Sequence, residues 1–328
     1  MAAAGPPDGA ALAARLRDGD LAAAPAVLNL VENRGAAARP QIAALLGGVS
    51  PTALGAEAAG HVIGVTGPPG AGKSTLLSTL VREWRGQDRS VAVLAVDPSS
   101  RRSGGSLLGD RARITFDPHD AATFIRSTAA GTRLGGLAPA TRAAAHALAI
   151  AFDVVVIETV GVGQSETEIS EVADTVAVIV QPGSGDSLQF LKSGIMEIPD
   201  VLVVTKADLG QIALRARRDL AAALRSAGSR DTAVVAVSAV ASPPVGMAEL
   251  TQALDAHRAT LDLPARRLAS RRASALADFV VEHGERGLRA VGGRRDAGRL
   301  LAAQDPGDDI PTLVAALEAA APGIMGTA

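Results

Sequence analysis

The stretch HVIGVTGPPGAGKSTLL at residues 61–77 decides the fold of this chain. Its first six residues form an apolar run typical of a buried strand, and a helical pattern begins after residue 75. Between the two, residues 67–75 read GPPGAGKST and match G-x-x-x-x-G-K-[ST], the loop that surrounds phosphate groups where a strand leads into a helix. The sequence therefore predicts a P-loop nucleotide-binding fold.

The residue types of this loop suit a nucleotide and its metal ion. Glycines let the backbone N–H groups turn toward the phosphates, Lys73 reaches the β- and γ-phosphate oxygens, and the hydroxyl of Ser74 can bind Mg²⁺. We expect the following residues to bind the nucleotide: Gly67, Pro69, Gly70, Ala71, Gly72, Lys73, Ser74 and Thr75.

Six short Val- and Ile-rich runs alternate with helical segments between residues 61 and about 260. They are HVIGVT, SVAVLAVD, DVVVIET, DTVAVIVQ, DVLVVTK and TAVVAVS. Nearly continuous apolar strands separated by helices are typical of a parallel sheet covered on both faces. The sequence therefore predicts an α/β fold with a mostly parallel central sheet flanked by helices.

A second motif indicates which base is bound. TKAD at residues 205–208 follows the apolar run DVLVV and matches the guanine pattern [NT]KxD. The Asp208 carboxylate can accept from the N1–H and the exocyclic amine of guanine, which adenine does not offer in that geometry. We expect Thr205, Lys206 and Asp208 to bind the base, with Ser238 and Ala239 closing over its edge; the alternative is an ordinary turn at a strand end.

Three acidic residues lie at or soon after predicted strand ends, where ligands bind in such sheets. They are Asp97 in VDPSS, Asp110 in GGSLLGDR and Glu158 in ETVGVGQSE. We predict that Asp97, Asp110 and Glu158 act with Ser74 around Mg²⁺, and that the N–H of Gly161 faces the γ-phosphate. A purely structural role for Asp110 is the alternative.

Helical patterns flank the predicted sheet on both sides. We expect a helical N-terminal region at residues 1–58, a GTPase domain at 59–260 and a helical extension at 261–328. In the extension, Arg266, Arg267, Arg271 and Arg272 are interleaved with apolar residues. This predicts either a solvated basic face on an amphipathic helix or a surface for a partner or second subunit.

Composition excludes several functional classes. The 328 residues carry a net charge of -2, which provides no electrostatic basis for binding nucleic acid or an anionic membrane. There is no cysteine, so disulfides, thiolate metal sites and cysteine nucleophiles are excluded. No apolar run approaches the roughly 20 residues of a membrane span, and we expect a cytoplasmic protein.

Taken together, several segments resemble the MeaB/ArgK family of GTPases over about residues 20–260. The resemblance lies in GPPGAGKST, VDPSSRRSGGSLLGDRAR, FIRSTAAGTRLGG, ETVGVGQSE, QPGSGDSLQFLKSGIMEIPDVLVVTKAD and GMAEL. ETVGVGQSE together with the DPSS-to-GDR segment is more specific than the P-loop alone. Ordinary Ras-like GTPases carry D-x-x-G and no such segment.

The resemblance implies a GTPase that acts as a chaperone of an adenosylcobalamin-dependent acyl-CoA mutase, such as methylmalonyl-CoA mutase. It would gate cofactor loading and protect or reactivate the mutase, using GTP, GDP and Mg²⁺. The family pattern implies that Gln189 and Lys192 move toward the nucleotide when the mutase is bound. It also implies a homodimer formed through the C-terminal extension, and slow hydrolysis that the partner stimulates.

Three competing functions remain. One is a kinase of a transport-system binding protein, which the guanine motif TKAD argues against. Another is a nickel-insertion GTPase, which five scattered histidines and the lack of cysteine disfavour. The third is a nucleotide-gated scaffold without hydrolysis. The presence of Glu158 and Ser74 argues against it.

Overall fold

A computed structural model describes residues 7–97, 114–129, 137–159, 164–183, 199–226, 228–229 and 231–321. The chain divides into two compact units. The sheet unit comprises His61–Ala138 and Phe152–Leu261, and the helical unit comprises Met1–Gly60, Pro139–Ala151 and Asp262–Ala328. The divisions near residues 60 and 261 lie close to the expected domain boundaries. The sequence had not indicated that both ends of the chain belong to one unit.

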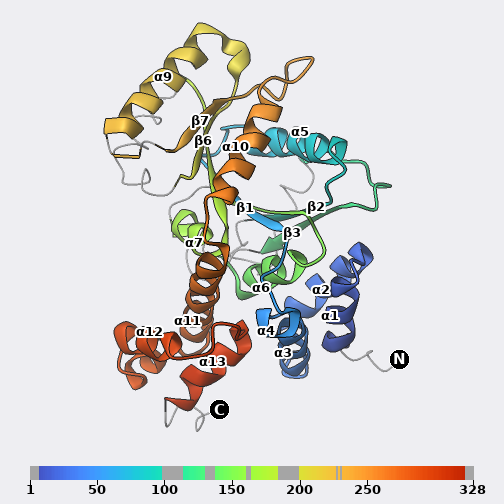
Figure 1. Cartoon of the computed structure of the whole chain (residues 1–328), viewed down its shortest axis with the longest axis vertical. Coiled ribbons are helices and arrows are strands. Elements are labelled where there is room, and N and C mark those ends of the chain that lie inside the picture. Colours follow the sequence, from blue (N-terminus) through green and yellow to red (C-terminus); the bar gives the residue numbers. More distant parts are fainter. Residues whose placement is uncertain are drawn as a thin grey trace, which may run out of the picture. The chain divides into compact units, whose positions relative to one another are not determined.

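Within the described residues, the sheet unit contains a seven-stranded parallel sheet in the order β3-β2-β4-β1-β5-β6-β7. Figure 1 shows this sheet with helices beside it. The predicted α/β fold class with a parallel P-loop sheet is therefore confirmed. The strands are β1 His61–Thr66, β2 Val91–Asp97, β3 Thr123–Ala129, β4 Val154–Thr159, β5 Thr175–Val180, β6 Val201–Val204 and β7 Ala233–Ala236.

Strand β3 was not among the six predicted strands. Its sequence, TFIRSTA, mixes polar and apolar residues, and among the described strands β3 pairs with β2 alone, at the edge of the sheet. An edge strand does not need the continuous apolar run by which the other six were recognised.

The helices of the sheet unit cover both faces of the sheet. They are α5 Lys73–Gly86, α7 Gln164–Val172, the short η4 Ala207–Leu209, α9 Gln211–Ser226 and α10 Met247–Ala259. Leu76, Leu80 and Trp84 of α5 share one buried core with Leu250 and Leu254 of α10. On the other face, α7 packs so closely on β1 that a Cβ at Gly64 would lie 2.8 Å from Ile169.

The helical unit is built from three parts of the chain. Its elements are α1 Gly9–Arg17, η1 Leu21–Ala23, α2 Ala24–Val31, α3 Ala38–Gly48, α4 Pro51–Leu54, α6 Pro139–Leu148, α11 Leu263–Ala290, α12 Arg294–Ala302 and α13 Ile310–Ala319. Phe279 and Leu313 are fully buried between the C-terminal helices. The helical patterns predicted at the two ends of the chain are thus present.

The expectation of a solvated basic face on α11 is wrong for two of its four arginines. Arg267 is only 5% exposed and donates to the backbone carbonyls of Ala58 and Gly60. Arg271 is 6% exposed and pairs with Glu57 at 2.9 Å. Helical periodicity places these side chains on the packed face, where the peptide carbonyls and a carboxylate accept their N–H groups.

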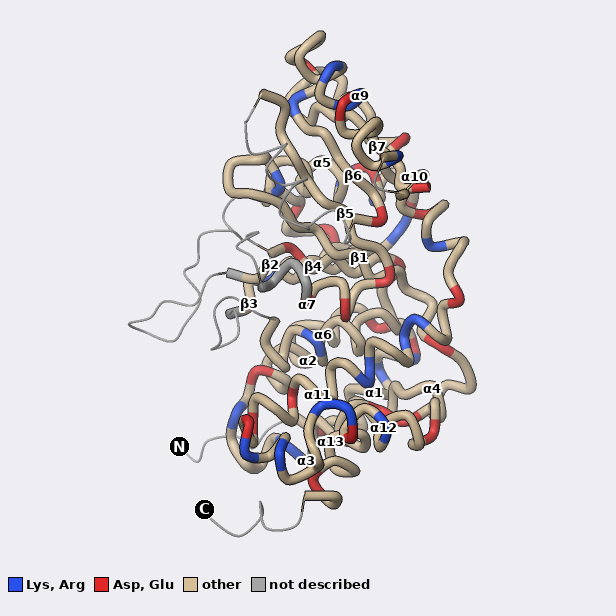
Figure 2. Tube along the Cα trace, turned by 90° about the vertical axis from the view of Figure 1, so that its left-hand side faces the viewer, with Lys and Arg blue, Asp and Glu red and all other residues tan. Residues whose placement is uncertain are grey.

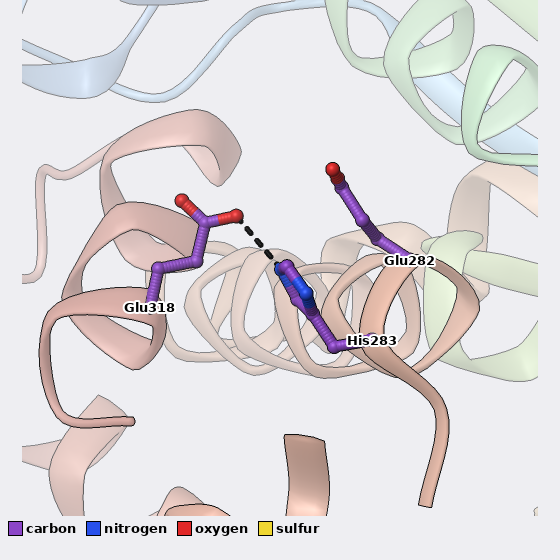
Figure 3. Close-up of side chains that lie close together, drawn as sticks. All are labelled: Glu282, His283 and Glu318. Atoms are coloured by element: carbon purple, nitrogen blue, oxygen red, sulfur yellow. Dashed lines mark hydrogen bonds and ion pairs between the residues drawn. The ribbon is translucent and has the colours of Figure 1, made fainter. Parts of the chain in front are cut away.

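A polar cluster connects α11 with α13 within the same unit. Figure 3 shows His283 of α11 facing Glu318 of α13, with Nε2 and Oε1 2.9 Å apart. The neighbouring Glu282 pairs with Arg39 of α3 at 2.5 Å. These interactions cross-link three helices at a place where Gly284 interrupts the helical backbone of α11 with φ 62°.

Acidic and basic residues both occur on helices such as α9 and α10 (Figure 2). Among the described residues, every helix is too short or too polar to cross a lipid bilayer.

Candidate nucleotide-binding site

The P-loop connects the end of β1 to the start of α5. Gly67 has φ 146°, and a Cβ at this position would lie 2.2 Å from the carbonyl oxygen of Ile179 on β5. Only glycine therefore lets the loop leave β1 against the neighbouring strand. Gly72, at φ 93°, is the N-cap of α5, whose first N–H groups form the kind of helix N-terminus that binds phosphate.

Lys73 is held within the loop itself. Its side chain is 7% exposed, and Nζ donates to the carbonyls of Gly67 at 2.6 Å and Pro68 at 3.2 Å. Pro69, Gly70 and Thr75 are exposed, so phosphate groups can approach them from solvent.

Ser74 and Glu158 meet across the ends of β1 and β4. The Ser74 hydroxyl donates to Oε1 of Glu158 at 3.3 Å, and Glu158 is only 3% exposed. A hydroxyl and a carboxylate at one point form the all-oxygen donor set that Mg²⁺ prefers. The residues present therefore fit the predicted metal.

The guanine motif adjoins the phosphate loop. The hydroxyl of Thr205, directly after β6, lies 2.7 Å from the carbonyl oxygen of Ala71 and 3.1 Å from that of Val180. Ala71 belongs to the P-loop, so one buried hydroxyl connects the two motifs. Ala71 itself is completely buried and belongs to the apolar core of the sheet unit.

Asp208 is oriented by the loop after β7. The Ser238 hydroxyl donates to Oδ1 of Asp208 at 2.6 Å, and the N–H of Ala207 donates to the Val237 carbonyl at 2.9 Å. Ala239 is half-buried beside the sheet core. The sequence placed these residues in one site, and the structure brings them together.

Other predicted positions lie outside the described residues. These are Asp110, Gly161, Gln189 and Lys192. For Asp97 the structure describes the backbone, as the last residue of β2 paired with Ala129 of β3. Its backbone is thus at the same end of the sheet as Glu158, because the strands are parallel.

Two residues near the site were missed by the sequence analysis. Gln181, next after β5, accepts a hydrogen bond from Nζ of Lys206, whose backbone is left-handed at φ 56°. Ser78, one turn after Ser74, donates to the Ser74 carbonyl and accepts from the N–H of Thr115. Position at a strand end could have indicated Gln181, whereas nothing in the local sequence marks Ser78.

Comparison with known proteins gives a consistent picture. A sequence model of the family described as "Methylmalonyl Co-A mutase-associated GTPase MeaB" matches residues 24–287. A putative GTPase of Pyrococcus horikoshii is 46% identical over 195 residues, which are 59% of this chain and 59% of that protein, so the match spans less than two thirds of its length. A putative GTPase of Pyrococcus abyssi is 41% identical over 262 residues, 79% of this chain and 78% of the relative.

The fold also matches that of a solved structure. A crystal structure described as an LAO/AO transport system kinase superposes with a TM-score of 0.65 at 28% sequence identity. The match covers 95% of this chain and 96% of the other. It therefore extends over both the sheet unit and the helical unit.

Proposed function

Because the chain belongs to the MeaB family of methylmalonyl-CoA mutase-associated GTPases, we propose that it binds GTP with Mg²⁺ and hydrolyses it to GDP and phosphate. The observation that carries this proposal is the bond from Thr205 to Ala71, because it joins a guanine motif to a phosphate loop. A site assembled in this way takes base and phosphates of one nucleotide together.

Lys73 is the proposed phosphate-binding side chain. In the structure its ammonium group is satisfied by the carbonyls of Gly67 and Pro68. On nucleotide binding it would exchange these for the β- and γ-phosphate oxygens, which are stronger, charged acceptors. The N–H groups at the start of α5 and the residues from Gly67 to Thr75 would bind the remaining oxygens.

Asp208 is the proposed base-reading residue. Its Oδ1 accepts from Ser238, which leaves the carboxylate with further acceptor capacity for the N1–H and the amine of guanine. Lys206 and Ala239 would border the base. A carboxylate fixed by a buried hydroxyl needs little reordering when the base arrives.

Ser74 and Glu158 would hold Mg²⁺, together with Asp97 and Asp110 as further proposed ligands. Mg²⁺ would neutralise charge that develops on the β- and γ-phosphates. Gly161, Gln189 and Lys192 are proposed to respond to the γ-phosphate, so that the bound nucleotide decides the state of the protein.

The client proposed for this switch is an adenosylcobalamin-dependent acyl-CoA mutase, whose cofactor loading and reactivation it would control. Support comes from the family description, which names a mutase association. The kinase alternative is suggested by the description of the superposed structure. The orientation of Asp208 by Ser238 favours a guanine-specific switch over a kinase.

Domain organisation and assembly follow the same proposal. We place the GTPase domain at residues 59–260, between the N-terminal region 1–58 and the extension 261–328, and we propose a homodimer formed through that extension. Light scattering at several protein concentrations measures the mass directly. A monomer mass at all concentrations would contradict the proposed dimer but not the proposed GTPase activity.

The first experiment measures phosphate release from GTP with and without each cobalamin-dependent mutase of the same organism. We expect slow release alone and faster release with one mutase. Asp208→Asn should switch the nucleotide preference from GTP to xanthosine triphosphate, because the asparagine amide can donate to the additional carbonyl of xanthine. Asp219→Asn, the same change at an exposed position on α9, is the matched control and should leave the preference unchanged.

The outcomes separate the two levels of the proposal. Stimulation by one mutase identifies the client. Hydrolysis that no mutase affects contradicts the chaperone role but leaves a guanine-nucleotide switch. If Asp208→Asn and Asp219→Asn behave alike, guanine recognition by TKAD is wrong.

A further inference from the structure

Two threonine hydroxyls meet inside the sheet directly behind the proposed metal site. Thr66 is the last residue of β1 and Thr159 the last residue of β4. The Thr159 hydroxyl donates to Oγ1 of Thr66 at 3.0 Å. Thr66 is 0% and Thr159 is 1% exposed, so the bond is shielded from water.

Each of these residues is next to a residue of the proposed site. Thr66 precedes Gly67, where the P-loop begins, and Thr159 follows Glu158. β1 and β4 are paired so that Val65 lies opposite Glu158. The hydroxyl bond therefore lies one residue beyond this pair and connects the strand that carries the P-loop to the strand that carries the carboxylate.

The pair cannot touch the metal itself. Successive side chains of a strand point to opposite faces of a sheet. Glu158 points toward Ser74 of α5, with which it is hydrogen bonded, so Thr159 points to the other face. Any influence of Thr159 on the site must pass through the backbone of β4 or, by its bond to Thr66, through the backbone of β1.

We propose that Thr159, through its bond to Thr66, is a positioning residue that sets the Glu158 carboxylate against Ser74 for Mg²⁺. This inference rests on the proposed function. The Ser74 to Glu158 distance of 3.3 Å depends on how far the ends of β1 and β4 are apart, and within the described residues the register of these two strands ends at Val65 and Glu158. The hydroxyl bond joins the last residues of the two strands, directly after that register.

The chemistry of the pair defines the variants. Thr159→Val keeps the shape of the side chain but leaves the Thr66 oxygen without this donor, which is costly in a buried place. Thr159→Ser keeps the hydroxyl and should restore function. Replacing both residues by valine removes the donor and the acceptor together, so folding should recover while the link stays absent.

The chain offers a matched control at the opposite ends of the strands of the same sheet. Thr175, the first residue of β5, is 0% exposed, and its hydroxyl lies 2.8 Å from His61 Nε2 and 2.9 Å from His257 Nδ1. Thr175→Val therefore also removes hydrogen bonds of a buried hydroxyl in the sheet unit. It does so at the strand starts, away from the P-loop.

The experiment titrates Mg²⁺ into the full chain with a fluorescent GTP analogue and measures the nucleotide affinity at each Mg²⁺ concentration. The reference is the binding of GDP measured in EDTA, where no free Mg²⁺ is present. For Thr159→Val and for the double valine variant, we expect half-saturation at about tenfold more Mg²⁺, the low end of the loss seen when outer-shell partners of a metal are removed. Binding of GDP in EDTA should be unchanged. Thr159→Ser and Thr175→Val should titrate as the wild type does.

Thermal unfolding of every variant separates positioning from stability. If the double valine variant or a folded Thr159→Val titrates like the wild type, or if Thr175→Val shifts the Mg²⁺ requirement equally, the inference is wrong. If the wild-type protein itself binds no GTP analogue at any Mg²⁺ concentration, the proposed function fails instead.

Discussion

Residue 205 shows how one side chain can join two binding motifs. The more common guanine motif begins with asparagine, whereas this chain has threonine. The shorter threonine side chain still reaches the P-loop, because its hydroxyl lies 2.7 Å from the Ala71 carbonyl oxygen. Thr205 is only 5% exposed. The P-loop and the guanine loop are therefore held together by a contact within the protein itself.

From this contact we predict that Thr205→Val weakens both GTP and GDP binding about fivefold, equivalent to about 1 kcal/mol for one hydrogen bond. Valine keeps the volume, so the loss would come from the loosened connection between base and phosphate sites. Dissociation rates of fluorescent GDP measure the effect. The comparison variant is Ser238→Ala, which removes the support of Asp208 and should also reduce discrimination against adenine nucleotides. Unchanged dissociation from Thr205→Val would contradict this role.

At the same scale, some site residues could be predicted from sequence and others could not. Lys73, Ser74 and Asp208 stand in motifs whose spacing is dictated by the nucleotide, so they were identified directly. Gln181 was not identified: its place at a strand end was a signal, but its contact with Lys206 depends on a left-handed backbone at residue 206 that local sequence does not reveal. Ser78 lies on an ordinary helix face and becomes recognisable only when Thr115 is placed beside it.

At the scale of elements, the edge of the sheet is held by an ion pair rather than by apolar packing alone. Arg85 near the end of α5 donates to Asp120 at 2.7 and 3.3 Å, and the same carboxylate accepts from the hydroxyl of Thr123, the first residue of β3. The strand with no apolar signature is thus attached to the P-loop helix. Sequence periodicity identifies apolar strands, so it found six strands and missed this one.

This contact gives a pH prediction. The hydrogen bond from Arg85 lowers the pKa of Asp120 below the ordinary aspartate value, although some burial opposes the shift. A carboxyl with a lowered folded-state pKa contributes stability above its unfolded pKa and loses it as the pH falls through the folded one. Asp120→Asn should reduce the free energy of unfolding by ~1 kcal/mol at neutral pH, since both partners are partly exposed. The difference from the wild type should begin to shrink below about pH 4 and should vanish once the pH is below the lowered folded-state pKa of Asp120.

Denaturant unfolding at a series of pH values measures this difference. Asp117→Asn, in the same turn, is the comparison variant: its carboxylate accepts from the N–H of His119 and forms no described ion pair. If the difference in free energy of unfolding between Asp120→Asn and the wild type persists at low pH, it does not come from the ion pair between Asp120 and Arg85.

At the scale of the whole molecule, the order of segments along the chain does not give the grouping in space. Composition indicated helical regions before and after the sheet, and both are present. Their combination with α6 into one unit depends on contacts between residues more than 200 positions apart, such as those from Arg267 to Ala58 and Gly60. Such pairings leave no periodic signal in the sequence. The sequence pattern therefore predicted the same solvent-exposed face for all four arginines of α11.

Arg271 tests that grouping. It donates to Glu57 at 2.9 Å and to the Pro306 carbonyl at 2.7 Å, and so ties three distant parts of the helical unit together. Its side chain is 7% and that of Glu57 is 13% exposed, so Arg271→Leu would leave a buried carboxylate without its counter-charge and should lower the free energy of unfolding by about 3 kcal/mol. The neighbouring Arg272, which donates to the Ala302 carbonyl, gives the matched variant Arg272→Leu, for which we expect less than about 1 kcal/mol. Replacing both Arg271 and Glu57 by leucine should recover part of the loss, because no buried charge remains. Equal destabilisation by the two single variants, measured in denaturant, would show that the ends of the chain are not joined through Arg271.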